Sequence, residues 1–174
     1  MEFIMKQSFF SALPTPIGDL GIFADNEAIY RVEFIDKVKN HDLMNTEVPK
    51  GSDLTLRAKK QLMQYFSGEI TVFDLPLAPQ GTLFRQQTWQ ALQKIPYGET
   101  RYYSQQAELM NNKKAVRAVG AANGANPIAI IIPCHRVIGK DGSLTGYAGG
   151  LHRKAWLLNF EQRLLQNKQG FTLN

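Results

Sequence analysis

The chain has little cysteine and histidine: its 174 residues include one cysteine, Cys134, and three histidines. One cysteine cannot form a disulfide within the chain, and the set lacks the thiolates that a structural zinc site requires. No apolar run approaches membrane-spanning length, and the first residues lack the apolar core and cleavage site of a secretory signal. We therefore expect a reduced, cytoplasmic protein with no metal, no cofactor and no membrane partner.

Charge is divided unevenly along a chain of otherwise ordinary composition. Hydrophobic residues make up 44 % and charged residues 20 %, as in a folded globular protein. Residues 1–80 hold 8 Lys/Arg and 11 Asp/Glu, hence −3, whereas residues 81–174 hold 12 and 4, hence +8. We predict two domains with these bounds. A basic half suits DNA, because neutralised phosphates release counterions, although a solvated basic face is the alternative.

Residues 1–80 predict a small α/β scaffold without chemistry of its own. Alternating apolar and polar residues around a turn predict two paired strands between residues 15 and 34. A helix is predicted between a cap at Ser52 or Asp53 and Gly68. Its apolar residues at helical spacing are Leu54, Ala58, Leu62 and Phe66. Val72–Phe73 suggest another short strand.

Residues 81–174 begin with three predicted helices. Thr82 caps the first, whose buried residues are predicted to be Phe84, Trp89 and Leu92. Ser104 is predicted to cap a short second helix that runs to Met110. After a tight turn, the third helix is predicted from about Lys113 to Asn123. Two short helices around a tight turn are typical of a helix-turn-helix.

The third of these helices has an unusual outward surface, with one long cation, Arg117, among small residues. Small side chains let a helix approach DNA closely. A reader of the major groove needs several long polar side chains, so their absence favours recognition of shape or of the minor groove. The alternative is that alanines here only favour a helix.

An apolar run, residues 128–132, predicts a strand buried on both faces and leads directly to Cys134. A glycine loop over residues 145–150 follows. The chain ends in a helix whose apolar stripe is predicted to be Leu151, Ala155, Leu158 and Leu165, widened by Trp156 and Phe160. Glu161 lies off that stripe.

Cys134 and His135 form the one candidate chemical pair. A thiolate is the reactive form of cysteine, and an imidazole can accept its proton or stabilise its charge. The alternative is a buried cysteine that acts as a small apolar residue. Neighbours on an extended strand point to opposite faces, so a direct contact would be strained; a water relay or a bend after Pro133 would remove that objection.

Four segments carry a resemblance to a known family. They are Asn126-Pro127, the block Ile-Pro-Cys-His-Arg-Val at 132–137, the loop Gly-Tyr-Ala-Gly-Gly at 146–150, and Glu161. Together they resemble the O6-alkylguanine-DNA alkyltransferases, also called methylated-DNA–protein-cysteine methyltransferases. The match is dense from Gly81 to Glu161 and looser at residues 15–18 and 65–68, so it covers nearly the whole chain.

The resemblance implies an α/β (α+β) fold with a ribonuclease H-like amino-terminal domain and a helical, winged-helix-like domain that holds the active site. It implies direct, single-turnover DNA repair in which Cys134 irreversibly accepts the alkyl group. His135 would act through a water, Glu161 would hold His135, and Asn126 would brace the turn beside the cysteine. The implied substrates are O6-alkylguanine and O4-alkylthymine in double-stranded DNA. The resemblance also implies that the protein is a zinc-free monomer.

Further roles follow from the same resemblance. Tyr103 would approach the flipped base and a phosphate, and Arg117 would fill the gap that the base leaves. The base pocket would be lined by Val137, Tyr147 and Ala148. Where some family members have serine, Ala148 offers only its backbone N–H. Contacts to the DNA backbone would come from Ser104, Asn112 and Lys140.

Two other functions would use parts of the same sequence. A binding module that flags damaged DNA would lack the reactive cysteine, and Cys134 argues against it. A Cys-His hydrolase oriented by Glu161 would turn over an ester or amide without DNA, which the basic half and Arg117 disfavour.

Overall fold

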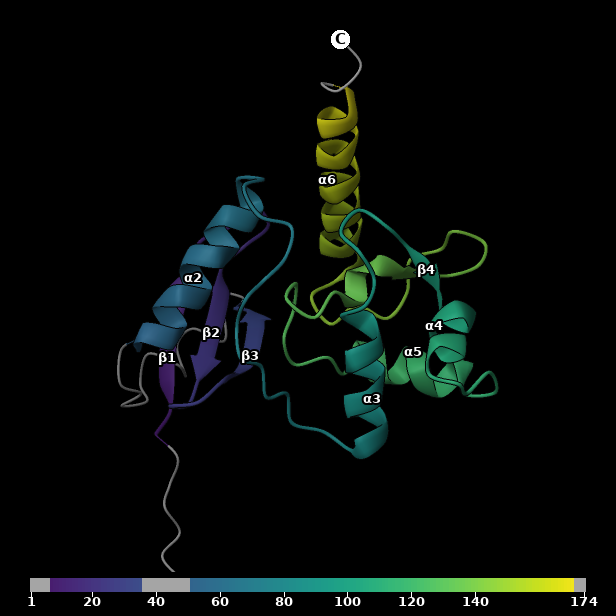
Figure 1. Ribbon diagram of the computed structural model, residues 1–174, viewed down its shortest axis with the longest axis horizontal. Coiled ribbons are helices and arrows are strands. Elements are labelled where there is room, and N and C mark those ends of the chain that lie inside the picture. Colours follow the sequence, from purple (N-terminus) through teal and green to yellow (C-terminus); the bar gives the residue numbers. More distant parts are fainter. Residues whose placement is uncertain (1–6, 36–50, 171–174) are drawn as a thin grey trace, which may run out of the picture. The chain divides into compact units, whose positions relative to one another are not determined.

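The computed structural model describes residues 7–35 and 51–170, which fall into two compact units, residues 1–80 and residues 81–174. Each unit is described by itself (Figure 1). The first contains β1 (Phe9–Leu13), β2 (Leu20–Ala24), β3 (Ile29–Phe34) and α2 (Asp53–Phe66). The second contains α3 (Leu83–Leu92), β4 (Arg101–Tyr102), α4 (Tyr103–Leu109), α5 (Val116–Gly124), the 3₁₀ turn η1 (Cys134–Arg136), β5 (Val137–Ile138) and α6 (Leu151–Gly170).

The first unit is an antiparallel sheet of order β1-β2-β3 with α2 packed across it (Figure 1). The predicted strand pair is confirmed as β2 and β3, and β1 adds a third strand. All five residues of the central strand β2 are buried. On β3, Val32 and Phe34 are buried while Arg31 is exposed, as the alternation predicts.

Helix α2 begins where the sequence predicts. The hydroxyl of Ser52 accepts a hydrogen bond from the N–H of Thr55, and the Thr55 hydroxyl accepts one from the N–H of Ser52. This reciprocal pair satisfies two N–H groups that a helix start leaves open. Ala58 and Leu62 are buried against the sheet together with Tyr65.

The predicted strand at Val72 and Phe73 is wrong. These residues lie in a bend and an irregular stretch, and Val72 is 77 % exposed. The chain rejoins the sheet later, through a single parallel bridge between Ile29 and Leu77. Prolines on both sides of Leu77 lack the N–H that a longer strand requires, so pairing stops after one bridge.

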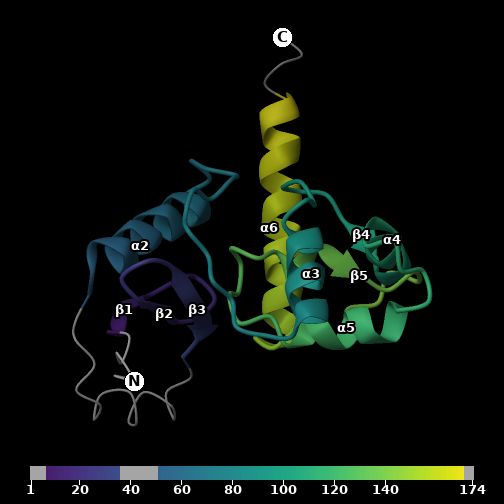
Figure 2. The ribbon, with the colours of Figure 1, turned by 60° about the horizontal axis from the view of Figure 1, so that its bottom comes forward.

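In the second unit, α3, α4 and α5 pack together, and α5 runs crosswise below α3 in the view of Figure 2. Thr82 caps α3 as predicted, and Trp89 is buried. The predicted pair of short helices is confirmed as α4 and α5, with shifted starts. Ser104 does not cap α4, because the helix already begins at Tyr103 with Tyr102 as its N-cap. The N–H of Tyr102 donates to Gln105 Oε1 at 2.8 Å.

Helix α5 begins at Val116, three residues later than predicted. Lys113 lies in a turn that follows Asn111, whose positive φ of 54° starts the reversal. Asparagine tolerates this left-handed conformation better than most residues. The turn therefore uses more of the chain than the two residues that the sequence indicates.

The predicted buried strand over residues 128–132 is also wrong, although its burial is right. The segment is a chain of tight turns in which Ile130 has a φ of 71° and the N–H of Ile131 donates to Ala129 at 2.8 Å. The Asn126 side chain replaces a strand partner: its amide accepts from the N–H of Ile128 and donates to the carbonyl of Ile132. Backbone groups satisfied in this way need no sheet.

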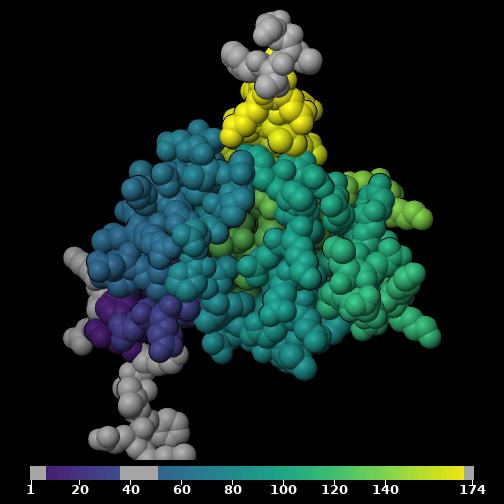
Figure 3. All heavy atoms as spheres, in the orientation of Figure 1, coloured from purple at the N-terminus to yellow at the C-terminus, as the bar shows by residue number. Residues whose placement is uncertain are grey.

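Helix α6 faces the interior with a different stripe from the one predicted. Its buried residues are Lys154, Leu157 and Glu161, whereas Leu151 is 48 % exposed. The spacing of apolar residues predicts the wrong buried face because Lys154 and Glu161, although charged, are buried by hydrogen bonds to residues outside α6. The last turns of α6 stand clear of the rest of their unit (Figure 3). None of the described helices is long and apolar enough to cross a membrane.

Candidate active site

Cys134 opens the 3₁₀ turn η1 and is 5 % exposed. Pro133 bends the chain just before it, with φ −85° and ψ 62°. The side-chain amide of Asn126 donates to Cys134 Sγ at 3.2 Å while it also bonds the carbonyl of Ile132 at 2.8 Å. The bend removes the strand geometry that argued against a Cys-His pair, and one asparagine holds both the turn and the thiol.

The thiol of Cys134 is held mainly in its neutral form. Burial raises the pKa of Cys134, while the hydrogen bond from Asn126 and the positive charge of Lys154 oppose that rise. A buried, neutral thiol is a weak nucleophile. The site therefore needs a base that removes the proton, and it already contains groups that stabilise the thiolate once it forms.

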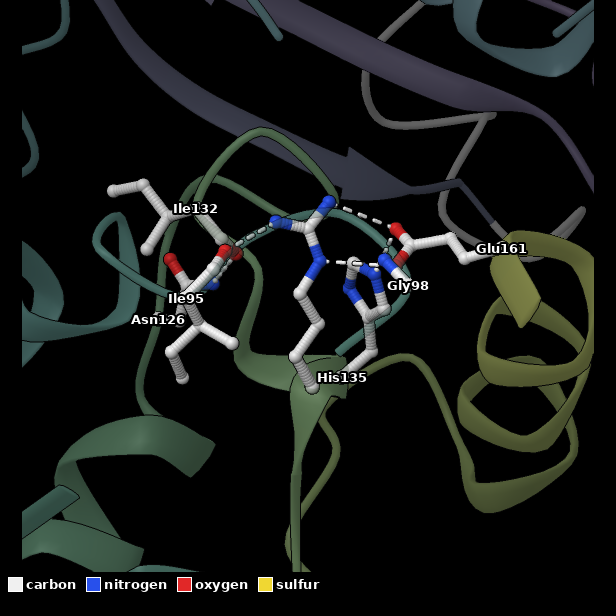
Figure 4. A network of polar contacts seen from close by, with 7 residues as sticks. Ile95, Gly98, Asn126, Ile132, His135 and Glu161 are labelled. Carbon is white, nitrogen blue, oxygen red and sulfur yellow. Dashed lines mark hydrogen bonds and ion pairs between the residues drawn. The ribbon is translucent and has the colours of Figure 1, made fainter. Parts of the chain in front are cut away.

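His135 is fully buried and bonded to Glu161, with Nε2 and Oε1 2.7 Å apart (Figure 4). An ionised carboxylate only accepts hydrogen bonds, so Nε2 carries the proton. Nδ1 then has a free lone pair, and no described residue donates to it. Burial lowers the pKa of His135 and the charge of Glu161 opposes that effect, so the ring is neutral at neutral pH. It can accept a proton.

Glu161 is the centre of a buried polar network (Figure 4). Arg136 donates to both of its oxygens, from Nε at 2.9 Å and from Nη2 at 3.0 Å, and the N–H of Gly98 donates at 3.1 Å. Burial raises the pKa of Glu161, but the hydrogen bonds from His135 and Arg136 and the positive charge of Arg136 outweigh it and hold that pKa well below its usual value. The carboxylate stays ionised, which fixes the tautomer of His135.

Sequence reasoning missed the role of Arg136, although the residue lies in the recognised block. Its Nη1 also donates to the carbonyl of Ile95 at 2.7 Å, so the guanidinium connects η1, the segment that follows α3, and α6. A charged residue next to a catalytic pair in sequence gives no signal of where it points. The bidentate geometry exists only in the fold.

Lys154 was also missed. It is 1 % exposed, and its Nζ donates to the carbonyl of Thr145 at 2.8 Å and to the Tyr103 hydroxyl at 3.4 Å. The only hint in the sequence is its spacing of seven residues from Glu161, which places both on one helix face. Lys154 brings a positive charge to the interior close enough to act on Cys134.

Tyr103 begins α4, directly after the strand β4 that pairs in parallel with β5, and this pairing brings α4 to the end of η1. Its hydroxyl donates to the carbonyl of Thr145 at 3.0 Å. A pocket of 260 Å³ is lined by Tyr103, Val116, Gly120, Thr145 and Gly146. A pocket of this size and mixed lining can hold a planar base.

The other residues predicted to hold the base do not line this pocket. Val137 is fully buried in β5, and Ala148 is exposed on the glycine loop. Tyr147 is buried, and no described residue bonds its hydroxyl. Their roles stay predictions.

The residues predicted to meet DNA lie outside the buried network. Those that are exposed are Ser104 on α4, Asn112 in the turn that follows, Arg117 in the first turn of α5, and Lys140 in the turn after β5. The structure thus brings the four predicted catalytic residues together and leaves the predicted DNA contacts on the surface. Among residues 7–35 and 51–170, no group of acidic, cysteine or histidine side chains could hold a metal ion.

Comparison with known proteins gives this arrangement a family. Residues 9–79 match the model of the 6-O-methylguanine DNA methyltransferase ribonuclease-like domain, and residues 83–163 match the DNA binding domain of the same family. Among curated proteins, the chain is 46 % identical to a methylated-DNA–protein-cysteine methyltransferase of Methanosarcina acetivorans, over 88 % of this chain and 97 % of that one. It is 45 % identical to the methylated-DNA–protein-cysteine methyltransferase of Haemophilus influenzae, over 91 % of this chain and 88 % of that one.

Solved structures agree. The crystal structure of O6-methylguanine methyltransferase from Mycobacterium tuberculosis aligns with a TM-score of 0.78 at 41 % identity, over 90 % of this chain and 93 % of that one. The protein from the same organism in complex with DNA aligns with a TM-score of 0.80 at 42 % identity, over 90 % of this chain and 94 % of that one.

The chain belongs to the 6-O-methylguanine DNA methyltransferase family, with the predicted pairing of a ribonuclease-like and a DNA-binding domain. It is a DNA-repair enzyme of the methylated-DNA–protein-cysteine methyltransferase class.

Proposed function

We propose that Cys134 takes the alkyl group from O6 of guanine in double-stranded DNA, and also from O4 of thymine, in one irreversible turnover. One observation carries this proposal: a buried thiol bonded to Asn126 lies next in the chain to a neutral imidazole whose Nδ1 is open. Nδ1 of His135 takes the thiol proton through a water, and Glu161 stabilises the imidazolium that forms.

The bond changes are those of a displacement at a saturated carbon. Sγ of Cys134 forms a bond to the alkyl carbon while the bond from that carbon to O6 breaks, and its electron pair passes to the guanine. Protonation or hydrogen bonding of the departing base lowers the barrier, and Tyr103, which lines the pocket, supplies it when its hydroxyl turns from the carbonyl of Thr145 to the base. The thioether product is a poor leaving group, so each molecule acts once.

The target base must leave the duplex to reach a buried thiol. Arg117, exposed at the start of α5, occupies the gap in the stack, and Ser104, Asn112 and Lys140 bind the backbone. The net charge of +8 on residues 81–174 supplies non-specific affinity, and the DNA complex of the Mycobacterium tuberculosis relative supports duplex DNA as the partner. By the family resemblance, Val137, Tyr147 and Ala148 line the pocket that receives the base.

We place this activity in the cytoplasm, in a monomer. Support comes from the substrate, which is cellular DNA, and from the reaction, which consumes a reduced thiol that an oxidising compartment would not preserve. A monomer suffices because one unit of one chain contains Cys134, its base and the pocket.

The test is the intact mass of the protein after mixing with a duplex that contains one O6-methylguanine. We expect the gain of one methyl group, mapped by peptide analysis to Cys134, and no gain in the Cys134→Ala variant, which still binds the duplex. Binding without a mass gain in the wild type would indicate a damage-flagging module instead. Turnover of an ester without DNA would indicate a hydrolase.

A second test concerns Arg117. Arg117→Ala slows transfer from duplex DNA more than it weakens binding, because the finger stabilises the flipped state rather than the initial complex. Single-turnover kinetics over a series of protein concentrations separate the two effects. A normal rate on duplex DNA would overturn the finger assignment.

A further inference from the structure

A reciprocal amide pair lies inside the helix-turn-helix, away from the buried Cys134 network. Gln106 on α4 and Asn123 on α5 are 0 % and 1 % exposed. Nε2 of Gln106 donates to Oδ1 of Asn123 at 2.9 Å, and Nδ2 of Asn123 donates to Oε1 of Gln106 at 2.6 Å. Gln106 Nε2 also donates to the carbonyl of Thr88 on α3 at 3.3 Å. Three helices are thus joined by directional bonds.

This pair is an unexpected choice for a helix junction if stability alone is considered. Burying two amides costs desolvation, and apolar side chains of similar volume often give equal or greater stability at such a site. What a fully satisfied polar pair adds is a defined geometry, as buried asparagines do when they fix the register of paired helices. A second directional bond acts alongside it, from Trp89 Nε1 to the carbonyl of Ala122 at 2.9 Å.

Helix α5, which the amide pair holds in place, has a residue with a proposed role in the reaction near each end. Arg117 lies in its first turn, and Asn126, which bonds Cys134 Sγ, follows its last residue by two positions. Between them, α5 passes close to the base pocket: a Cβ at Gly120 would lie 3.7 Å from the ring of Tyr103. A small rotation or slide of α5 would move Arg117, the pocket wall and the thiol's hydrogen-bond donor together.

We propose that Gln106 and Asn123 are positioning residues for alkyl transfer: their paired amides fix the rotation and axial register of α5, and through it the places of Arg117 and Asn126. This inference rests on the proposed function of Cys134. Neither amide touches the substrate. Their effect is on the geometry from which the reaction starts, and small misplacements of reacting groups are expensive in rate.

The test compares three variants of the full chain in single-turnover transfer from a methylated duplex. Gln106→Leu combined with Asn123→Leu removes both amides and leaves neither unpaired. Gln106→Asn shortens one arm by a methylene, so the pair cannot close. Gln106→Asn combined with Asn123→Gln exchanges the two side chains and keeps the summed length of the pair. Transfer from free benzylated guanine, which needs no Arg117 finger, is measured in parallel.

A suicide reaction separates positioning from folding, because its amplitude counts active molecules and its rate constant reports their geometry. We expect the leucine pair to keep full amplitude and DNA affinity while the rate constant on duplex DNA falls about tenfold or more. Gln106→Asn slows the reaction less, and the exchanged pair returns the rate toward the wild-type value. Duplex DNA is affected more than the free base.

A wild-type rate constant in either variant that lacks the reciprocal pair would overturn the proposal. If the leucine pair does not fold, the other two variants test the proposal. It then requires that Gln106→Asn lowers the rate constant on duplex DNA and that the exchanged pair restores it. Failure of the function itself is visible separately, since the wild-type protein would then gain no methyl on Cys134.

Discussion

The two units of this chain differ most in what they bury. In the described part of the first unit, the buried polar residue is Thr55, whose hydroxyl serves the start of α2. The described part of the second unit buries eight polar or charged residues. They are Thr88, Gln106, Asn123, Asn126, His135, Arg136, Lys154 and Glu161.

Charges inside a protein are costly, so their position shows where chemistry outweighs stability. The first unit has the apolar interior of a scaffold and a net charge of −3 in its half of the sequence. The second accepts buried charges because a thiol needs a base and stabilising groups in a place from which bulk water is excluded. Stability and pH response are therefore expected to differ between the units.

The largest effect is expected from Glu161→Gln. It leaves the guanidinium of Arg136 buried without its partner, and removing one member of a buried ion pair costs about 3–5 kcal/mol. Both tryptophans, Trp89 and Trp156, lie in the second unit, so urea unfolding followed by tryptophan fluorescence reports on that unit. A loss of free energy of unfolding below about 1 kcal/mol would show that the network is not the stabilising centre of the unit.

A smaller effect on stability, but a clear one on chemistry, is expected from Lys154→Met. The positive charge lowers the pKa of Cys134, so its removal leaves less thiolate at neutral pH. Transfer should slow by about tenfold or more, the range that loss of one nearby opposite charge produces. Raising the pH should recover part of the rate, measured as the single-turnover rate constant. An unchanged pH profile would exclude this electrostatic role.

A change of pH should act on the second unit in a known direction. The folded pKa of Glu161 lies well below its usual value, so the stability it contributes is present above the unfolded pKa and is lost as pH falls through the folded one. The folded pKa of His135 is also lowered, so below about pH 6.5 the unfolded chain binds the extra proton. The His135 effect reduces the free energy of unfolding as pH falls below about 6.5, and the Glu161 effect adds to it as pH falls below about 4.5.

The control for that measurement is the Glu161→Gln variant, again followed by tryptophan fluorescence. Below about pH 4.5 its unfolding should depend less steeply on pH, because the carboxyl group with the depressed pKa is gone. Equal slopes in the two proteins would mean that other carboxyl groups cause the acid sensitivity.

The smallest effect is expected in the first unit, from Arg57→Ala. Arg57 and Asp74 form an ion pair at 3.1 Å, but the two side chains are 48 % and 96 % exposed. Such pairs contribute about 0–1 kcal/mol. Thermal unfolding by circular dichroism should shift little, and transfer to Cys134 should keep its rate. A large loss of rate would show that this unit is more than a scaffold.

The sequence predicted most where local rules govern the structure. Ser52 and Thr82 each begin a helix as their capping chemistry indicates, and the apolar spacing of α2 placed Ala58 and Leu62 in the core. It failed where distant partners override local pattern. Ile130 lies in a left-handed turn instead of a strand, and the Asn126 side chain bonds the backbone on either side of it, at Ile128 and Ile132.

The candidate site shows the same division. Cys134, His135, Asn126 and Glu161 were identified through a motif, whereas Arg136 and Lys154 emerged from the structure. The apolar spacing of α6 could not predict its buried face. Lys154 and Glu161 lie on that face, and they are buried through ion pairing and hydrogen bonding rather than through apolarity.

The sequence by itself determined the family, the nucleophile, the charge asymmetry and the helices that carry their own caps. The tertiary structure alone decided which nitrogen of His135 is open, what holds Glu161 ionised, and how an amide pair sets α5. The physical reason is range: capping and periodicity act within a few residues, whereas the polarity of a buried site is fixed by groups that only folding brings within hydrogen-bond distance.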